Sequence, residues 1–453
     1  MNVRRCLPAA LLATLLPLAA GAQQPAPRIP GTLTLADALR IARENNPGYR
    51  QTLNNLDVSA VGVRQAWANF LPSASASMSF GGSQNTTSRA TGVFGETVTR
   101  QDTTIRNSSA SQGFGMNLTL FDGGAMFRRY AAARARERST EADVALALAT
   151  VDAQVTRDFY EARRTAMLVD VELRNLNTAR ERYDQNVERF RLAAVDQVAL
   201  LDAQRAVITA EQNLRNTEAN AAKSLLTLRQ TLGIESDVPF EIADDEVPVF
   251  DPTGIDGGAL VATAMAQSPT VRQRLAALEA ARQDASAARG GRWPSISAGF
   301  NYSRSTSERE FGAFGELNPD GSRGFSFNMS FSLPIFNRFQ TSMQVAQSDA
   351  AREDAVHALR SERLIVERTV RAGLIDLERA YVGVQTAEQI ATISRQQVEL
   401  AEEQFRSGAL DFLRFQQLVE ADAQAQRQVV EARFAFVTAR VALEEKLGAP
   451  IAR

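Results

Sequence analysis

Strict alternation between apolar and small polar residues marks four short segments of the chain, at 73–80, 114–120, 296–303 and 325–333. In the first segment serine alternates with alanine, methionine and phenylalanine, and in the last phenylalanine, methionine and leucine alternate with serine and asparagine. This pattern predicts β-strands with one apolar and one polar face. It is typical of strands of about ten residues that span a membrane as part of a barrel. An antiparallel sheet half-buried on a soluble core shows the same pattern and is the alternative.

The composition around these segments favours the membrane interpretation. The polar faces consist almost entirely of Ser, Asn, Thr and Gly, which suits a water-filled lumen. Trp67 and Trp293 flank the starts of two strands, where an aromatic belt would lie. The stretches 82–110 and 304–323 are rich in Ser, Thr, Asn and Arg and are predicted to be long loops on the outer side. The side chains predicted to face lipid are Phe80, Phe114, Met116, Phe300, Phe327, Met329 and Phe331.

The number of strands predicts an assembly of chains. Four strands cannot close a barrel, because the smallest known barrels have about eight. An open sheet edge in lipid leaves backbone N–H and C=O groups without partners, which costs several kcal/mol for each group. If these strands span a membrane, at least two chains must therefore associate.

Most of the remaining chain is predicted to be helical. From 125 to 192 apolar residues recur at steps of three and four, which predicts one long helix of roughly 100 Å at about 1.5 Å per residue. The segments 48–70 and 196–232 together are about as long as this helix, so two shorter helices are expected end to end beside it. The segments 269–292 and 411–447 predict the same arrangement around a second long helix. The predicted shape is a rod.

The two sets of strands and helices belong to an internal duplication. Residues 46–51 resemble 268–273 at an offset of 222, and residues 188–191 resemble 403–406 at an offset of 215. Each copy is therefore expected to contain a helix, a β-hairpin, a long helix and a return helix. The expected division is a first copy at 23–233 with its hairpin at 72–121, a linker at 234–256, a second copy at 257–448 with its hairpin at 294–334, and a short tail at 449–453.

The far end of each long helix carries a turn motif. In the second copy the helix is expected to end before Gly408, which suits a left-handed residue after a helix, and Asp411 is expected to cap the next helix. In the first copy Ala193 replaces the glycine and Asp196 keeps the cap. Both aspartates are interpreted as helix caps rather than as binding groups in a lumen.

Charge and composition exclude several classes of function. The chain has 453 residues and a formal net charge of −2, which is not the excess of positive charge expected of a nucleic-acid binder. Its only cysteine is Cys6 and its only histidine is His357, which rules out Cys/His zinc sites and a Cys–His dyad. The eight methionines form no cluster that could bind a soft metal. No enzyme activity, cofactor or metal is predicted, and His357 is interpreted as a solvated helix residue.

The N-terminus is predicted to be a signal peptide at 1–22. Arg4 and Arg5 precede a short apolar stretch, and Ala20-Gly21-Ala22 supplies the small residues of a cleavage site. Cleavage after Ala22 would remove Cys6, so the mature chain would contain no cysteine and no lipid-modified N-terminus.

Taken together, these features resemble the outer-membrane efflux protein family, the TolC-like channels. The resemblance is carried by the order and duplication of the motifs Leu71-Pro72 and Trp293-Pro294 before the strands and Phe190…Asp196 and Phe405…Gly408…Asp411 at the turns. It implies a mainly α fold with a transmembrane β-barrel part: a homotrimer whose twelve-stranded barrel, four strands per chain, continues into a long α-helical coiled-coil barrel. The chain would be a passive exit duct in the outer membrane of a Gram-negative bacterium, in a tripartite efflux or type I secretion system.

The resemblance also implies where partners bind. In the family the helical tips dock to a periplasmic adaptor, also called a membrane fusion protein, which links the duct to an inner-membrane transporter. Some members constrict the tip with acidic residues six and nine positions after the tip glycine. Here Arg414 and Gln417 occupy these positions, and only Asp202 of the first copy is acidic, so these three residues are the candidate constriction. The candidate docking residues are Arg191, Ala193, Asp196, Arg406, Gly408 and Asp411.

A periplasmic coiled-coil adaptor without a channel is the alternative function. Such a protein would need a lipoyl-like β domain around one helical hairpin, whereas this chain has two hairpins, each with alternating strands. The pump selects the cargo in systems of this kind, so drugs, small anions and polypeptides all remain open as substrates.

Overall fold

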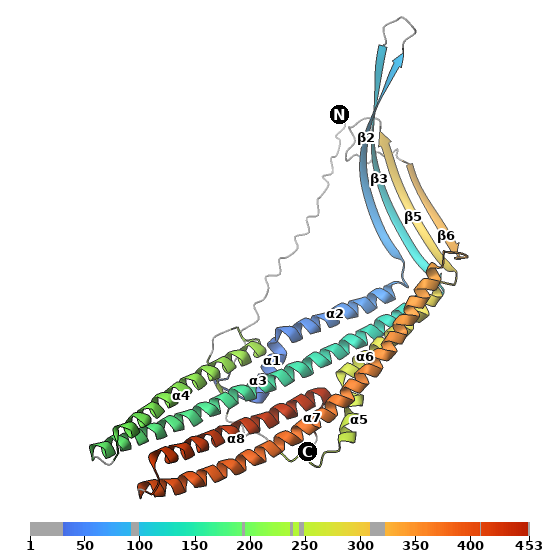
Figure 1. The fold of residues 1–453 in the computed structure, drawn as a ribbon. Coiled ribbons are helices and arrows are strands. Elements are labelled where there is room, and N and C mark those ends of the chain that lie inside the picture. Colours follow the sequence, from blue (N-terminus) through green and yellow to red (C-terminus); the bar gives the residue numbers. More distant parts are fainter. Residues whose placement is uncertain are drawn as a thin grey trace.

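The computed structural model is a long layer of helices with a β-sheet at one end (Figure 1). The predicted signal peptide, Ala193 and Gly408 lie outside the described residues. The structure describes residues 30–91, 99–192, 195–235, 239–243, 249–308, 322–407 and 409–451.

Four antiparallel strands form the sheet, in the order β2-β3-β5-β6. They are β2 (Ser73–Thr91), β3 (Thr99–Asp122), β5 (Ser295–Glu308) and β6 (Ser322–Ser332). Each hairpin of the duplication supplies two neighbouring strands, and β3 joins β5 across the two copies. The strands β2 and β6 form the two outer edges of the sheet.

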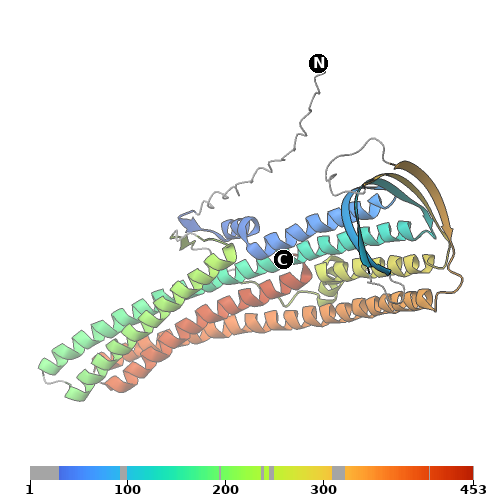
Figure 2. The same cartoon turned by 90° about the horizontal axis from the view of Figure 1, so that it is seen from above.

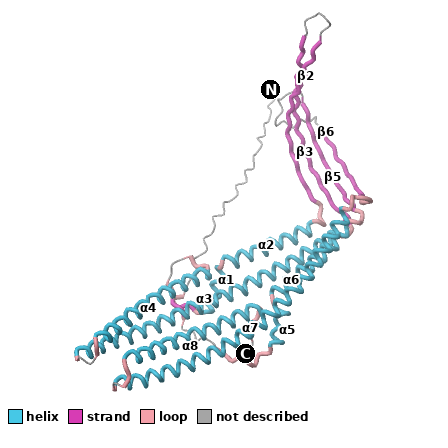
Figure 3. The backbone as a smooth tube through the Cα atoms, viewed as in Figure 1, coloured by secondary structure: helices cyan, strands magenta, loops and turns pink. Residues whose placement is uncertain are grey.

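The strands are longer than the sequence predicts. Most of the stretch 82–110, expected to be a loop, is a hairpin whose pairing continues to Thr91 opposite Thr99. It extends beyond β5 and β6 (Figure 3). Threonine favours extended backbone, and the hydroxyls of Thr86 and Thr104 lie 3.1 Å apart across the hairpin. In the second copy the expected loop 304–323 is shorter at both ends, because β5 continues to Glu308 and β6 begins at Ser322, and residues 309–321 lie outside the described part.

The helices confirm the predicted long and broken partners. Figure 2 shows α2, α3, α6 and α7, coloured blue, teal, yellow and orange, side by side below the sheet. Toward the other end, α4 and α8 continue where α2 and α6 stop, each beside its long helix (Figure 1). The helices are α2 (Pro47–Ala68), α3 (Ala125–Arg191), α4 (Gln197–Leu232), α6 (Pro269–Gly290), α7 (Gln340–Arg406) and α8 (Phe412–Leu447).

Short elements that the sequence reading missed surround the middle of the rod. They are α1 (Leu35–Asn45), α5 (Gly257–Gln267) and a small parallel sheet in which β1 (Thr32–Leu33) pairs with β4 (Glu241–Ile242). Because β4 lies within 234–256, part of the predicted linker is packed on the helices, with Phe240 buried.

Each copy has its own hydrophobic core. The first includes Phe159 of α3 and Leu228 of α4, together with Phe434 of α8. The second includes Leu377 of α7 and Phe436 of α8. Since α8 contributes to both cores, it packs the two copies against each other. Among the described residues, no helix is both long enough and apolar enough to cross a membrane.

The junctions between strand and long helix share an unusual backbone. Gly123 and Gly124 precede α3 with φ of 71° and 77°. In the second copy Arg338 and Phe339 precede α7 with φ of 55° and 63°, at the same offset of 215 residues that relates the tips. Both copies therefore turn from sheet to helix through two left-handed residues.

Candidate functional site

One face of the sheet is apolar across all four strands. The pairing places Met116 opposite Phe300, and Phe300 opposite Phe327. Phe325 and Phe327 are 81% and 72% exposed, so nothing in this single chain covers them. All seven residues predicted to face lipid share this face of the sheet. A face this apolar and this exposed needs an apolar environment outside the chain.

The opposite face is polar and tightly filled. Its serines pair across strands, as in the contact of 2.6 Å between the hydroxyls of Ser297 and Ser330. A Cβ atom at Gly299 would lie 2.6 Å from Oδ1 of Asn328, so the amide fills the space above this glycine. The small residues of this face are therefore required by their neighbours, in addition to suiting contact with water.

The regular alternation predicted for 114–120 fails near its end. The pairing of β3 with β5 shifts between Thr119 and Phe121, which leaves Leu120 as an extra residue and puts Phe121 opposite Ile296. A bulge of this kind bends the strand and increases its twist. It lies next to the turn into α3, where the chain must change direction.

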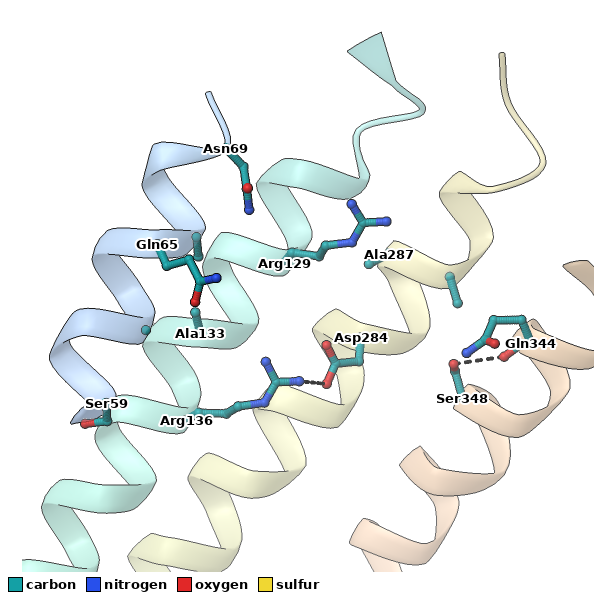
Figure 4. Close-up of a pocket in the computed structure, with 13 residues that line it drawn as sticks. Ser59, Gln65, Asn69, Arg129, Ala133, Arg136, Asp284, Ala287, Gln344 and Ser348 are labelled. Carbon is teal, nitrogen blue, oxygen red and sulfur yellow. Dashed lines mark hydrogen bonds and ion pairs between the residues drawn. The ribbon is translucent and has the colours of Figure 1, made fainter. Parts of the chain in front are cut away.

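Below the sheet, four helices line a polar pocket of about 770 Å³ (Figure 4). Arg136 of α3 reaches across to pair with Asp284 of α6, and Arg129, one further turn along α3, pairs with Asp122 at 3.2 Å. Both arginines are thus balanced by acids. The pocket suits water and polar solutes, and no described group of His, Cys, Asp and Glu in the chain could hold a metal ion.

Ion pairs join the two copies in the middle of the rod. Arg427 of α8 contacts the buried Glu172 of α3 at 2.9 Å, and Arg157 of α3 contacts Glu445 of α8 at 3.0 Å. Burial raises the pKa of Glu445, but hydrogen bonds from Lys446 and Arg157 outweigh it and leave the pKa below its usual value. The α3–α8 contact is therefore charged and specific, since a partner lost from it would leave a buried charge unpaired.

At the tips the two predicted caps are confirmed. The Asp196 carboxylate accepts a hydrogen bond from the backbone N–H of Ala199 at 2.9 Å, and Asp411 accepts one from Arg414 at 2.7 Å. Both aspartates are therefore used within the chain to begin α4 and α8.

The remaining predicted tip residues are exposed or half-exposed and interact locally. Arg191 pairs with Glu188 at 2.9 Å, and Arg406 pairs with Glu402. In the candidate constriction, Asp202 pairs with Arg205 at 3.0 Å. Arg414 donates to Gln417 at 3.2 Å.

A cluster near the second tip was not predicted. The rings of Phe405 and Phe415 stack with centroids 4.9 Å apart and planes 7° from parallel. The guanidinium of Arg189 lies 4.3 Å from the centre of the Phe405 ring, and that of Arg182 lies 4.8 Å from the centre of Phe415. We call these four residues the tip clasp, since α3 supplies both cations and α7 and α8 supply the rings.

The environment of the tip clasp explains why it matters. Burial lowers the pKa of Arg182, and the nearby Glu402 and Glu181 partly oppose this effect. An arginine remains charged in proteins, so Arg182 depends on the ring and these acids for stabilisation. The signal in the sequence was the spacing of seven between the two arginines, which places them on one face of α3.

Comparison with known proteins supports this description. A sequence model of the family described as outer membrane efflux protein matches residues 38–234 and 260–449. The protein CyaE of Bordetella pertussis is 24% identical over 353 residues, which cover 77% of this chain and 70% of CyaE.

Solved structures show the same fold. The outer membrane channel CmeC of Campylobacter jejuni superposes with a TM-score of 0.74 at 17% identity, covering 91% of this chain and 85% of CmeC. The open state of the MtrE channel of Neisseria gonorrhoeae gives a TM-score of 0.69 at 19% identity, covering 92% of this chain and 89% of MtrE. The predicted fold, mainly helical with a β-barrel part, is confirmed. The chain belongs to the outer membrane efflux protein family and is an exit duct of efflux or secretion systems in the outer membrane.

Proposed function

We propose that three copies of this chain close a twelve-stranded barrel through the outer membrane, and that their helices form one periplasmic tube below it. The apolar face of the sheet, with the seven predicted residues, contacts lipid, and the polar face lines the lumen. The tube conducts cargo passively and catalyses no reaction. The two copies at 23–233 and 257–448 are the repeating units of its wall, and the chain from Gln23 is the mature protein.

The observation that carries this proposal is the pair of open sheet edges. Directions alternate along the sheet, so β2 and β6 run in opposite directions. The β6 edge of one chain can therefore continue onto the β2 edge of the next as another antiparallel pair. Repeating this step closes the sheet with an even number of strands, and no backbone edge remains in lipid.

The tips supply the support for docking to an adaptor. Large apolar side chains are exposed there, among them Leu192 at 79% and Val198 at 63% in the first copy. In the second copy Leu413, at the position equivalent to Val198, is 60% exposed. Exposed apolar residues beside the candidate docking residues suit contact with a partner protein, here a periplasmic adaptor of an inner-membrane transporter.

Cysteine cross-linking tests the closure. The proposed mature chain contains no cysteine, so a pair introduced by Ser77→Cys on β2 and Ser330→Cys on β6 reports only on the contact between chains. Oxidation in outer-membrane fractions should give a covalent ladder that ends at three chains, while either single variant gives dimers at most. A ladder that ends at another number, or no cross-link at any position along the two edges, would reject the trimer.

The same preparation tests the N-terminus. An intact mass that corresponds to a chain starting at Gln23 without added lipid supports cleavage after Ala22. A mass that retains Cys6 or a lipid contradicts it.

A further inference from the structure

A row of polar and basic side chains borders the apolar face of the sheet. The pairing places Gln112 of β3 opposite Arg304 of β5, and Arg304 opposite Arg323 of β6. These three residues, which we call the basic row, lie on the same face as the lipid-facing aromatic residues, because each is two positions from one of them. The adjacent row is Phe114, Tyr302 and Phe325.

The basic row stands at the end of the sheet away from the helices. The apolar positions of β6 run from Phe325 to Leu333, about 26 Å along the strand at roughly 3.3 Å per residue. Arg323 lies one step of about 7 Å beyond them, away from α7. In an outer-membrane barrel this is the level where the outer lipid headgroups begin.

The two arginines face each other across neighbouring strands. Like charges directly opposite in a sheet are unfavourable unless something compensates them. Arg323 is exposed, and its guanidinium forms no ion pair with any residue that the structure describes. Arg304 is half-buried beside it. Two adjacent guanidinium groups and the Gln112 amide present a planar array of donors, which is the arrangement that binds phosphate.

We propose that the basic row binds the phosphate of a lipid headgroup in the outer leaflet, while Tyr302 and Phe325 contact the acyl chains of the same lipid. This proposal rests on the proposed function, since it requires the apolar face to contact lipid. The phosphate screens the repulsion between Arg304 and Arg323, and the aromatic row directly beside it favours a phosphate attached to an apolar tail over a free ion.

The test uses the purified assembled protein, stripped of lipid in detergent, and the double variant Arg304→Gln/Arg323→Gln. The probes are lipid A, enzymatically dephosphorylated lipid A and inorganic phosphate, with binding followed by native mass spectrometry and by thermal unfolding. The matched control is Arg106→Gln, because Arg106 lies on the same face of β3 but farther out, where it donates to Gln84 at 3.2 Å.

Lipid A should bind the unmodified protein at least ten times more tightly than its dephosphorylated form and should raise the unfolding temperature. The double variant should lose this tenfold preference and the lipid-dependent rise, whereas Arg106→Gln should keep both. Without lipid, the double variant should unfold at the same or a higher temperature than the unmodified protein, because it lacks the repulsion. A purely structural role for the arginines predicts the opposite change.

Three results would overturn the proposal. These are equal binding of lipid A and its dephosphorylated form, an unchanged preference in the double variant, and inorganic phosphate that stabilises the protein as strongly as lipid A. Failure of the proposed function looks different: neither lipid would bind, and arginine at Phe327 would assemble normally.

Discussion

At the scale of single residues, the turn from sheet to helix depends on Gly123 more than on its neighbour. A Cβ atom at Gly123 would lie 2.3 Å from the backbone oxygen of Gly290 and 2.9 Å from Cβ of Trp293. A Cβ atom at Gly124 would meet nothing within 4 Å. Both residues have positive φ, so a side chain costs about 1–2 kcal/mol at either position, and only Gly123 adds a steric overlap with backbone.

We therefore expect Gly123→Ala to reduce the yield of assembled protein sharply and Gly124→Ala to lower its stability by only about 1 kcal/mol. Thermal unfolding of the purified protein, with yield measured in the outer-membrane fraction, checks both. Equal effects of the two substitutions would show that the close approach to Gly290 does not constrain the junction.

This scale also shows where sequence reasoning stops. Asp196 and Asp411 were predicted as caps because a cap is a local motif, and the structure confirms both. Nothing in the residue types of Arg338 and Phe339 indicates a left-handed backbone, because their conformation follows from the junction around them. The tip clasp was missed for a similar reason, since it joins residues about 220 positions apart.

At the scale of the elements, the two faces of β6 should respond differently to charge. Phe327 lies on the apolar face and Asn328 on the polar face. We expect Phe327→Arg to cost about 2–4 kcal/mol if it faces the middle of the membrane, which should reduce assembly. Asn328→Arg should assemble and change single-channel conductance in planar bilayers. Comparable loss of assembly in both variants would contradict the assignment of the faces.

Strand length is the element property that the sequence predicted least well. The alternation of 73–80 stops where both faces become polar, so the expected strand ended there. The structure continues the hairpin to Thr91, because polar cross-strand pairs such as Thr86 with Thr104 hold it without an apolar face. Alternation reports how a strand is buried, and a strand in water on both faces lacks that signal.

The tip clasp should hold the first hairpin of helices against the second. Replacing Arg182 by Gln removes the cation from the Phe415 ring, at a cost of about 1–2 kcal/mol for a desolvated pair. We expect faster amide hydrogen exchange near 400–420 in this variant. Arg205→Gln is the control, because Arg205 is 73% exposed and pairs only with Asp202 on its own helix. If both variants exchange alike, the clasp does not join the hairpins.

At the scale of the whole molecule, docking should depend on exposed apolar residues that folding does not use. Val198→Asp and Leu413→Asp change side chains that are 63% and 60% exposed, so each should alter stability by less than about 0.5 kcal/mol. We expect normal assembly in the outer membrane together with loss of export from cells. The equally exposed Val58→Asp on α2, at 70%, is the control far from the tips. Normal export in both tip variants would place the docking surface elsewhere.

The overall arrangement was the most predictable property of the chain. The duplication, the two long helices and the broken return path all follow from periodicity and from lengths that add up. The short elements at the middle of the rod escaped because two-residue strands such as β1 and β4 carry no periodic pattern. They are defined by the helices around them, including the buried Phe240 within the expected linker.

The paired left-handed junctions also carry information about descent. After the gene segment for one half was copied, the residues at 338 and 339 diverged from the glycines at 123 and 124, yet the backbone kept the same rare conformation. The turns after α4 and α8 tell the same history with Gly233 and Gly448, whose φ values of 71° and 70° are almost identical. Ancestry is therefore recorded here in dihedral angles, which can reveal a common origin after the amino acids themselves no longer do.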